Sequence, residues 1–103
     1  MSDTATISKT DEVVKLQPNY AVILHDDDAH TINFVIETLG KVFRYGIDKC
    51  TILAWQVHYE GRSIVWIGPL ETAEFKRDLL TNCGEDPYNK TNAPLNVTIE
   101  PMV

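Results

Sequence analysis

The 103-residue sequence lacks the features of several large classes of protein. It has two cysteines, Cys50 and Cys83, and they form no Cys-x-x-Cys pair, so neither a zinc cluster nor a secreted disulfide framework is expected. Positive charge is scarce, since the chain has nine Lys and Arg residues against fifteen Asp and Glu residues. Its net charge is therefore -6. An acidic surface repels phosphate, so we expect no nucleic-acid partner.

Long apolar runs are also missing. No segment approaches the roughly 20 apolar residues that a membrane-spanning helix needs. Residues 1–15 lack the basic and apolar regions of a signal peptide. We therefore expect no membrane partner and a cytoplasmic location.

The common signatures of enzymes are absent as well. The sequence has no phosphate-binding loop, no dinucleotide fingerprint and no nucleophile elbow. Cys50 and His58 lie on one predicted helix, too far apart along its axis for a hydrogen bond. We predict a protein with no catalytic activity, no cofactor and no metal.

The composition is that of an ordinary globular domain. Hydrophobic residues make up 44% of the chain and charged residues 23%. Residues 1–18 are rich in Ser, Thr, Asp and Lys and have few large apolar side chains, which predicts a flexible N-terminal tail. Residues 19–103 are predicted to form a single domain.

Three short segments have the character of strands, because they are rich in β-branched residues or alternate between apolar and polar side chains. They span Tyr20–Leu24, Ser63–Gly68 and Leu95–Glu100. Pro101 is expected to end the last of them.

Three further segments have helical spacing of apolar residues. The first runs from Thr31 to Phe43 and carries a single apolar stripe. The second is predicted from an N-cap at Asp48 to about Tyr59, with Gly61 as its left-handed C-cap. Ile52, Trp55 and Tyr59 share one face of this helix.

The third helix is predicted to start with Pro69 at its first position and to stop at Gly84. The order of elements is then β-α-α-β-α-β. Three strands and three helices in so short a chain predict an α+β fold, with one sheet packed against helices.

A cluster of ionisable side chains lies between the first strand and the first helix, at His25, Asp26–Asp28 and His30. Loops held between rigid elements often carry binding groups. The structural alternative is that one Asp caps the helix and that the others are solvated. A calcium loop is disfavoured because Thr31 stands where the turn requires Gly. A zinc site would need all three histidines of the chain to converge from different elements.

Four parts of the sequence together match the pattern of a known family: Tyr20–Ile36, Val57–Gly61, Ala73–Lys76, and Pro94-Leu95 followed by Thr98–Glu100. In this order, they resemble the first strand with its acidic loop and first helix, the end of the second helix, a part of the third helix, and the last strand of the ClpS adaptors. The resemblance covers about residues 19 to 101, with the elements in the same order.

The resemblance implies an adaptor for N-degrons, the N-end-rule signals of protein degradation. Such adaptors bind a bulky apolar N-terminal residue, namely Leu, Phe, Tyr or Trp. They deliver the substrate to the N-domain of a ClpA-type AAA+ unfoldase, which works with the ClpP protease. The implied fold is a three-stranded antiparallel sheet packed against three helices.

The resemblance assigns binding of the substrate α-amino group to Asp26, Asp27 and His58. The chemistry of these residues agrees, because a free α-amino group has a pKa of about 7.7–8.0 and is largely an ammonium near neutral pH. The ammonium offers three donors, and carboxylate oxygens and a neutral imidazole nitrogen accept them. An acetylated N-terminus would leave these acceptors unpaired.

The second half of the implied site is a pocket for the N-terminal side chain. Burial of a Leu or Phe there contributes on the order of 1.5–3 kcal/mol. The pocket residues carried over from the family are His30, Ile32, Val35, Ala54, Val57 and Leu95. The apolar members have an alternative interpretation as ordinary core.

Glu71 and Lys76 match positions that the family uses to dock on the unfoldase. Their alternative is a solvated pair of charges on a helix surface, and such pairs contribute little to stability.

The sequence departs from the family pattern at the site. Asp26 replaces an Asn, while Ile32 and Ala54 stand where the family often has bulky Met residues. Smaller side chains in the wall should enlarge the pocket, unless the side chain of Trp55 fills the added space. The hypothesis is a broader or altered specificity that favours Trp and Phe over Leu.

A further departure is His30, which replaces a helix-capping Thr and moves the predicted cap to Asp28 or Thr31. Residues 85–93 form a loop that is longer than expected for the family. Two rival functions remain. One is a domain of this fold that has diverged to another unfoldase-linked binding role. The other is a small metal-dependent hydrolase built on the His/Asp cluster.

Overall fold

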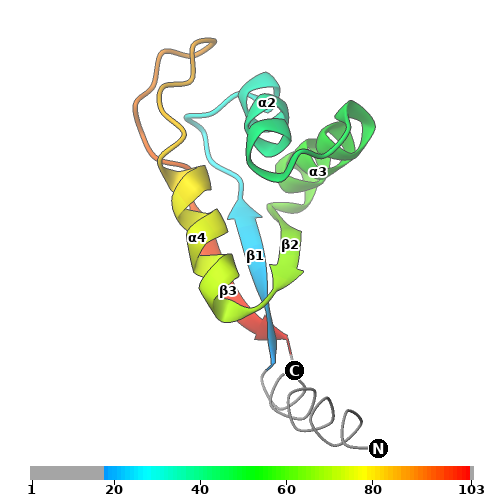
Figure 1. The fold of residues 1–103 in the computed structure, drawn as a ribbon. Helices are drawn as coiled ribbons and strands as arrows, with labels where there is room; N and C mark the ends of the chain where they lie inside the picture. Colours follow the sequence, from blue (N-terminus) through cyan, green and yellow to red (C-terminus); the bar gives the residue numbers. More distant parts are fainter. Residues whose placement is uncertain (1–17, 103) are drawn as a thin grey trace, which may run out of the picture.

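The computed structural model describes residues 18–102, so the predicted tail lies outside the described residues except for Pro18. The elements follow one another in the order β-α-α-β-α-β, which confirms the prediction (Figure 1). The strands are β1 (Asn19–His25), β2 (Arg62–Gly68) and β3 (Val97–Met102), and the helices are α2 (Ile32–Phe43), α3 (Ile47–Glu60) and α4 (Leu70–Thr81).

The strands form an antiparallel sheet in the order β2-β1-β3, with β1 in the centre. Val22 pairs with Trp66 of β2 on one side and with Ile99 of β3 on the other. The register between β1 and β2 shifts between Val22 and Ile23. The prediction that Pro101 ends the last strand is wrong, since Pro101 pairs with Tyr20 inside β3. A proline is tolerated there because β3 is an edge strand.

The helices surround a single apolar core. Helix α4 crosses strands β1 and β3, whereas α2 and α3 lie together near the end of β1 and beside β2 (Figure 1). Residues from every helix and from β1 and β2 are buried in this core: Val22, Leu24, Phe34, Val35, Leu39, Cys50, Ala54, Val57, Val65, Ala73, Leu80 and Leu95. The core therefore lies between the sheet and the three helices.

The ends of α2 follow its sequence. Its N-cap is Thr31, one of the two predicted candidates, whose hydroxyl accepts a hydrogen bond of 3.2 Å from the backbone N–H of Phe34. This bond satisfies a donor that the first turn of a helix leaves free. Arg44 ends the helix in the left-handed conformation, and its N–H donates to the carbonyl of Gly40.

The ends of α3 and α4 differ in part from the predictions. Gly61 is the left-handed C-cap of α3, as predicted, with φ of 87°. The predicted cap at Asp48 is wrong, because the helix starts at Ile47 and Asp48 lies in its first turn, where a negative charge favours the helix dipole. Pro69 is the N-cap of α4 rather than its first residue, and α4 ends at Thr81, before Gly84.

The shared face of Ile52, Trp55 and Tyr59 on α3 points to solvent. Their exposed fractions are 67%, 40% and 77%. The core side of the helix is formed by small residues, Ala54 among them. This arrangement leaves an apolar ridge on the outside of α3.

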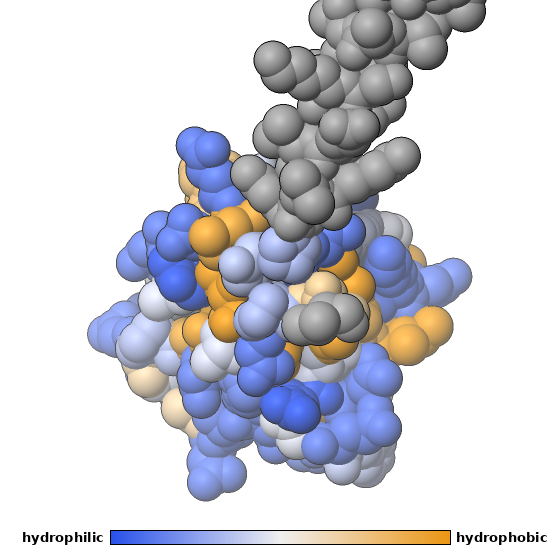
Figure 2. Space-filling view, turned by 90° about the horizontal axis from the view of Figure 1, so that it is seen from below, coloured by the Kyte–Doolittle hydropathy of each residue, from blue (hydrophilic) through white to orange (hydrophobic). Residues whose placement is uncertain are grey.

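The surface is mixed in character. Figure 2, which views the molecule from below, shows hydrophilic side chains over most of that face and hydrophobic atoms between them. None of the helices in residues 18–102 is long and apolar enough to span a membrane.

Candidate functional site

The loop after β1 is held by backbone hydrogen bonds at its first residues. The N–H of His25 donates to the carbonyl of Asn96, and the N–H of Asp26 donates to the carbonyl of Gly61, both at 2.9 Å. Gly61 can make this contact because it ends α3 in the left-handed conformation. The loop is thereby fixed beside the last turn of α3, which carries His58.

Asp26 and His58 face each other across this junction. Oδ1 of Asp26 lies 3.9 Å from Nδ1 of His58, and the two side chains are 39% and 49% exposed. This distance is too long for a direct hydrogen bond. The pair is therefore a carboxylate and an imidazole that are close together, open to solvent and free to accept a third group between them.

Asp27 has a different role within the loop. Its Oδ1 accepts hydrogen bonds of 2.8 Å from the backbone N–H groups of Ala29 and His30, and its Oδ2 lies 2.7 Å from Nδ1 of His30. These bonds fix the turn that leads into α2. The carboxylate is still 25% exposed and retains acceptor capacity, since an ionised carboxylate has about four acceptor sites.

His30 is a structural connector. Its side chain is 3% exposed, its ring stacks on Phe34 with centroids 5.4 Å apart, and Nε2 lies 2.7 Å from the carbonyl oxygen of Ala93. A carbonyl oxygen only accepts, so Nε2 is the donor in the contact with Ala93, and Nδ1 lies against the carboxylate of Asp27. His30 thus joins the first loop to the segment before β3.

A buried carboxylate, Asp86, anchors the 85–93 loop. It is fully buried and accepts hydrogen bonds from the N–H of Thr31 at 2.7 Å and from those of Tyr88 and Asn89 at 2.9 and 3.3 Å. The hydroxyl of Thr31 adds a bond of 3.1 Å. Burial raises the pKa of this carboxyl, but the hydrogen bonds outweigh burial and leave the pKa below its ordinary value.

Asn89 adds a further link, because its side-chain amide donates to the carbonyl of Ala29 at 2.8 Å. The 85–93 loop, for which the sequence offered no explanation, is therefore fixed against the loop that carries Asp26. Sequence reasoning missed Asp86, because its main partner is 55 positions away. The nearest local signal is the Asp86-Pro87 pair, which is typical of a turn.

The apolar residues assigned to the pocket lie in one place. Val35, Ala54, Val57 and Leu95 are buried members of the core, and Ile32 is partly buried and packs against it. They come from α2, α3 and the segment before β3. Ile32 is the least buried member of the group.

Trp55 points away from this group. Its indole ring stacks on the ring of Tyr59, with centroids 5.3 Å apart and an angle of 19°, and meets the ring of His58 edge-on at 5.7 Å. The side chain therefore lies on the outer surface of α3, beside the Asp26–His58 pair.

Glu71 and Lys76 lie on α4, away from the Asp26–His58 pair. Glu71 is exposed in the first turn of the helix. The ammonium of Lys76 donates to the carbonyl of Val42 at 3.4 Å and lies 5.6 Å from the centroid of the Phe43 ring. Lys76 is thus directed to the end of α2.

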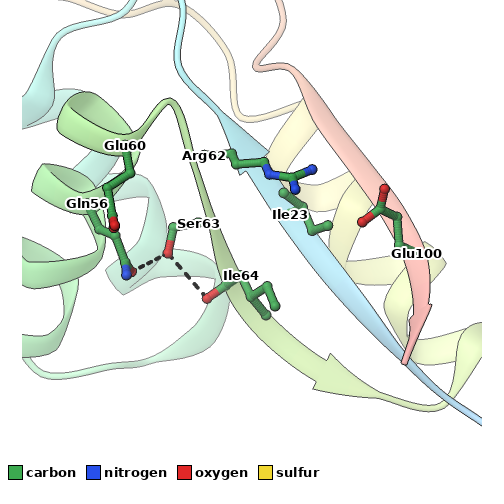
Figure 3. A pocket seen from close by; sticks show the side chains of 7 residues that line it. All are labelled: Ile23, Gln56, Glu60, Arg62, Ser63, Ile64 and Glu100. Carbon is green, nitrogen blue, oxygen red and sulfur yellow. Dashed lines mark hydrogen bonds between the residues drawn. The ribbon is translucent and has the colours of Figure 1, made fainter. Parts of the chain in front are cut away.

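A groove of about 470 Å³ opens on the sheet face opposite α4 (Figure 3). A hydrogen bond from Ser63 to Gln56 crosses one side of it. Its lining residues are Ile23, Gln56, Glu60, Arg62, Ser63, Ile64 and Glu100. None of them belongs to the predicted site, although Glu60 and Arg62 flank Gly61, whose carbonyl accepts from the N–H of Asp26.

The three histidines do not converge. Nε2 of His25 lies 2.7 Å from the hydroxyl of Thr98, while His30 and His58 have the contacts described above. Within residues 18–102, no group of three or more His, Cys, Asp or Glu side chains is placed to hold a metal ion. Cys50 and Cys83 are free thiols, and burial raises the pKa of both.

The structure is a small α+β domain in which an accessible carboxylate–imidazole pair, Asp26 and His58, lies beside the last turn of α3. The family model described as ATP-dependent Clp protease adaptor protein ClpS matches residues 15–98. The chain belongs to the ClpS family.

Individual relatives agree with this assignment. The ATP-dependent Clp protease adapter protein ClpS of Nostoc sp. is 42% identical over 86 residues, which cover 79% of this chain and 86% of the relative. The protein of the same name from Edwardsiella ictaluri is 36% identical over 92 residues, with coverage of 89% and 83%.

A solved structure is also similar. The structure of Agrobacterium tumefaciens ClpS2 bound to L-phenylalaninamide matches with a TM-score of 0.73 and 29% sequence identity. The match covers 82% of this chain and 98% of that one. The predicted α+β fold is therefore confirmed.

Proposed function

We propose that this chain is a non-catalytic adaptor that binds N-degrons and delivers them to a Clp unfoldase for degradation. The observation that carries the proposal is the pair formed by Asp26 and His58, 3.9 Å apart and open to solvent. His58 directly follows Val57, a buried member of the apolar cluster, so the proposed site joins acceptors for a cation to a surface for an apolar side chain.

The pair suits the α-amino group of a peptide. A nitrogen placed between two acceptors that are 3.9 Å apart can lie about 2.9 Å from both. The third proton of the ammonium is available to the remaining acceptor capacity of Asp27. Bonds from a charged donor are shorter and stronger than those between neutral groups. The site therefore distinguishes a free N-terminus from an acetylated or internal residue.

The side chain of the N-terminal residue is proposed to enter beside Ile32, against Val35, Ala54, Val57 and Leu95. Movement of Ile32 would admit it to the apolar cluster. His30, which stacks on Phe34, is proposed to border this entrance.

The structure of the Agrobacterium relative with L-phenylalaninamide supports an aromatic ligand. The small side chain of Ala54, with Trp55 turned outward, favours Phe and Trp over Leu.

Delivery is proposed to use Glu71 and Lys76 on α4 as part of the docking face for the N-domain of a ClpA-type unfoldase. The relatives support this role through their name, ATP-dependent Clp protease adapter protein. An adaptor of this kind acts in the cytoplasm together with the ClpP protease.

The test is fluorescence anisotropy with labelled peptides that differ at the N-terminal residue alone. The series contains Phe, Trp, Tyr, Leu, Ile, Met and Gly, with an N-acetylated Phe peptide as the control. We expect tight binding of Phe and Trp, weaker binding of Leu, and loss of binding after acetylation.

His58→Ala should weaken binding of the Phe peptide about tenfold or more, since a hydrogen bond to a charged group contributes about 1.5–3 kcal/mol. His25→Ala is the matched control and should change the affinity less than about twofold, because His25 bonds to Thr98 instead. Absence of binding across the whole series would contradict the proposal and favour a domain that has diverged to another role.

A further inference from the structure

The outer side of α3 carries large apolar side chains that the fold does not use. Tyr59 and Ile52 are 77% and 67% exposed, and Trp55 is 40% exposed. We call these three residues the α3 ridge. The rings of Trp55 and Tyr59 stack on each other at 5.3 Å, so the ridge offers a preformed flat surface rather than separate flexible side chains.

The ridge is continuous with the proposed amine site. The ring centroid of His58 lies 5.7 Å from that of Trp55 and 5.2 Å from that of Tyr59, and both rings meet it edge-on. Trp55 and His58 are three residues apart on one helix and so share a side of it. A ligand anchored at His58 therefore has the ridge directly beside it.

We propose that the α3 ridge is a second subsite, which binds the side chain of the residue that follows the N-terminal residue of the substrate. This inference rests on the proposed function, because it needs a peptide that is anchored by its α-amino group. An extended chain advances about 3.3–3.6 Å per residue. The second residue of a peptide anchored between Asp26 and His58 thus lies within one or two residue lengths of the ridge rings.

The chemistry of the ridge selects the kind of side chain. Two stacked aromatic faces and an exposed Ile favour an aromatic or large aliphatic residue, which gains contact area without losing hydrogen bonds to water. An acidic side chain is disfavoured, because the exposed carboxylate of Asp26 lies 3.9 Å from His58, which both ridge rings contact, and the whole chain carries a net charge of -6. Glycine offers no side chain and gains nothing.

The experiment measures anisotropy with C-terminally labelled peptides that begin with Phe and differ at the second residue. Phe, Leu, Gly and Asp are compared at that position. The expected dissociation constant is about fivefold lower for Phe-Phe than for Phe-Gly, the factor that an aromatic contact of this kind contributes. The Phe-Asp peptide should bind more weakly than Phe-Gly.

Substitutions in the ridge should remove this preference without removing the amine site. In Tyr59→Ala and Trp55→Ala, the dissociation constant of Phe-Gly divided by that of Phe-Phe should fall toward one. The dissociation constant of Phe-Gly itself should stay within about twofold of its wild-type value. Trp55→Phe keeps a ring and should keep most of the ratio. Tyr59→Ala is the safer variant for folding, because that side chain is largely exposed.

Ile47→Ala is the matched control. Ile47 is an apolar residue of the same helix and is 69% exposed, but it lies eleven residues before His58, about 16 Å along the helix axis. This variant should leave all four affinities unchanged. If Ile47→Ala also lost the preference for Phe-Phe over Phe-Gly, the assignment of the subsite to the ridge would be overturned.

The outcomes separate this inference from the proposed function. Equal binding of Phe-Phe and Phe-Gly by the wild type, with the acetylated peptide still rejected, would overturn the second subsite and leave the amine site intact. Ridge variants that keep the ratio but lose binding to the unfoldase would also overturn it, and would make the ridge a docking surface. Failure of every peptide to bind would overturn both.

Discussion

Replacement of Asp86 by Ala should destabilise the protein by about 3 kcal/mol at pH 7. The carboxylate is fully buried and accepts hydrogen bonds from the N–H groups of Thr31, Tyr88 and Asn89. A hydrogen bond to a charged group contributes about 1.5–3 kcal/mol, and the two shortest of these bonds account for the estimate. For a domain of this size, such a loss corresponds to a fall of about 15 °C in Tm.

The loss should depend on pH in a defined direction. The pKa of Asp86 is lowered in the folded state, so the unfolded chain binds the proton more readily and folding is favoured at high pH. The contribution of the ionised group is fully present above the unfolded value of about 3.9 and is lost as the pH falls through the folded pKa. The stability gap between wild type and Asp86→Ala should therefore shrink from pH 7 to pH 3.

The assay is urea unfolding followed by circular dichroism at pH 7, 5 and 3. Glu85→Ala is the matched control, because Glu85 is the exposed neighbour of Asp86 and should change stability by less than about 0.5 kcal/mol. The reasoning would be refuted by a loss below about 1 kcal/mol at pH 7. It would also be refuted by a gap that stays constant down to pH 3.

Three further predictions concern the core, a helix end and the thiols. Leu39→Ala should lower the free energy of unfolding, measured in urea, by about 3 kcal/mol because Leu39 is fully buried. Leu79→Ala, at an exposed position, should lower it by less than about 1 kcal/mol. Gly61→Ala should cost about 1 kcal/mol from its φ of 87° alone, since nothing lies within 4 Å of an added Cβ; an unchanged Tm would count against this. Burial raises the pKa of Cys50 and Cys83, so both should react slowly with a thiol reagent at neutral pH until urea is added, and fast labelling of native Cys50 would be inconsistent with the structure.

The sequence predicts the order of the elements because the signals are local. The apolar stripe of α2 and the glycine at the end of α3 are visible within a few residues of each other. The errors arise where tertiary context decides. Asp48 satisfies the rules for an N-cap, yet the helix starts earlier, at Ile47. Pro101 remains in a strand because β3 is at the sheet edge, which no local pattern reveals.

The proximity of two candidate site residues could be predicted, whereas their binding role stays a prediction. The resemblance to the family named Asp26 and His58, and the structure brings these two residues together through the bond between Asp26 and Gly61. Asp86 could not be predicted as an anchor, because its contact with Thr31 joins segments that are far apart in the chain. The outward direction of Trp55 also depends on packing, since an indole on a helix is usually expected in the core.

The central claim is that Asp26 and His58 bind a free α-amino group, and a thermodynamic cycle tests it most directly. Isothermal titration would compare a Phe-initiated peptide with its desamino analogue, which lacks the amine and nothing else, on the wild type and on His58→Ala. We expect the amine to strengthen binding at least tenfold on the wild type, and most of this factor to vanish in His58→Ala. An amine effect of the same size on both proteins would contradict the claim, because the ammonium would then be bound elsewhere.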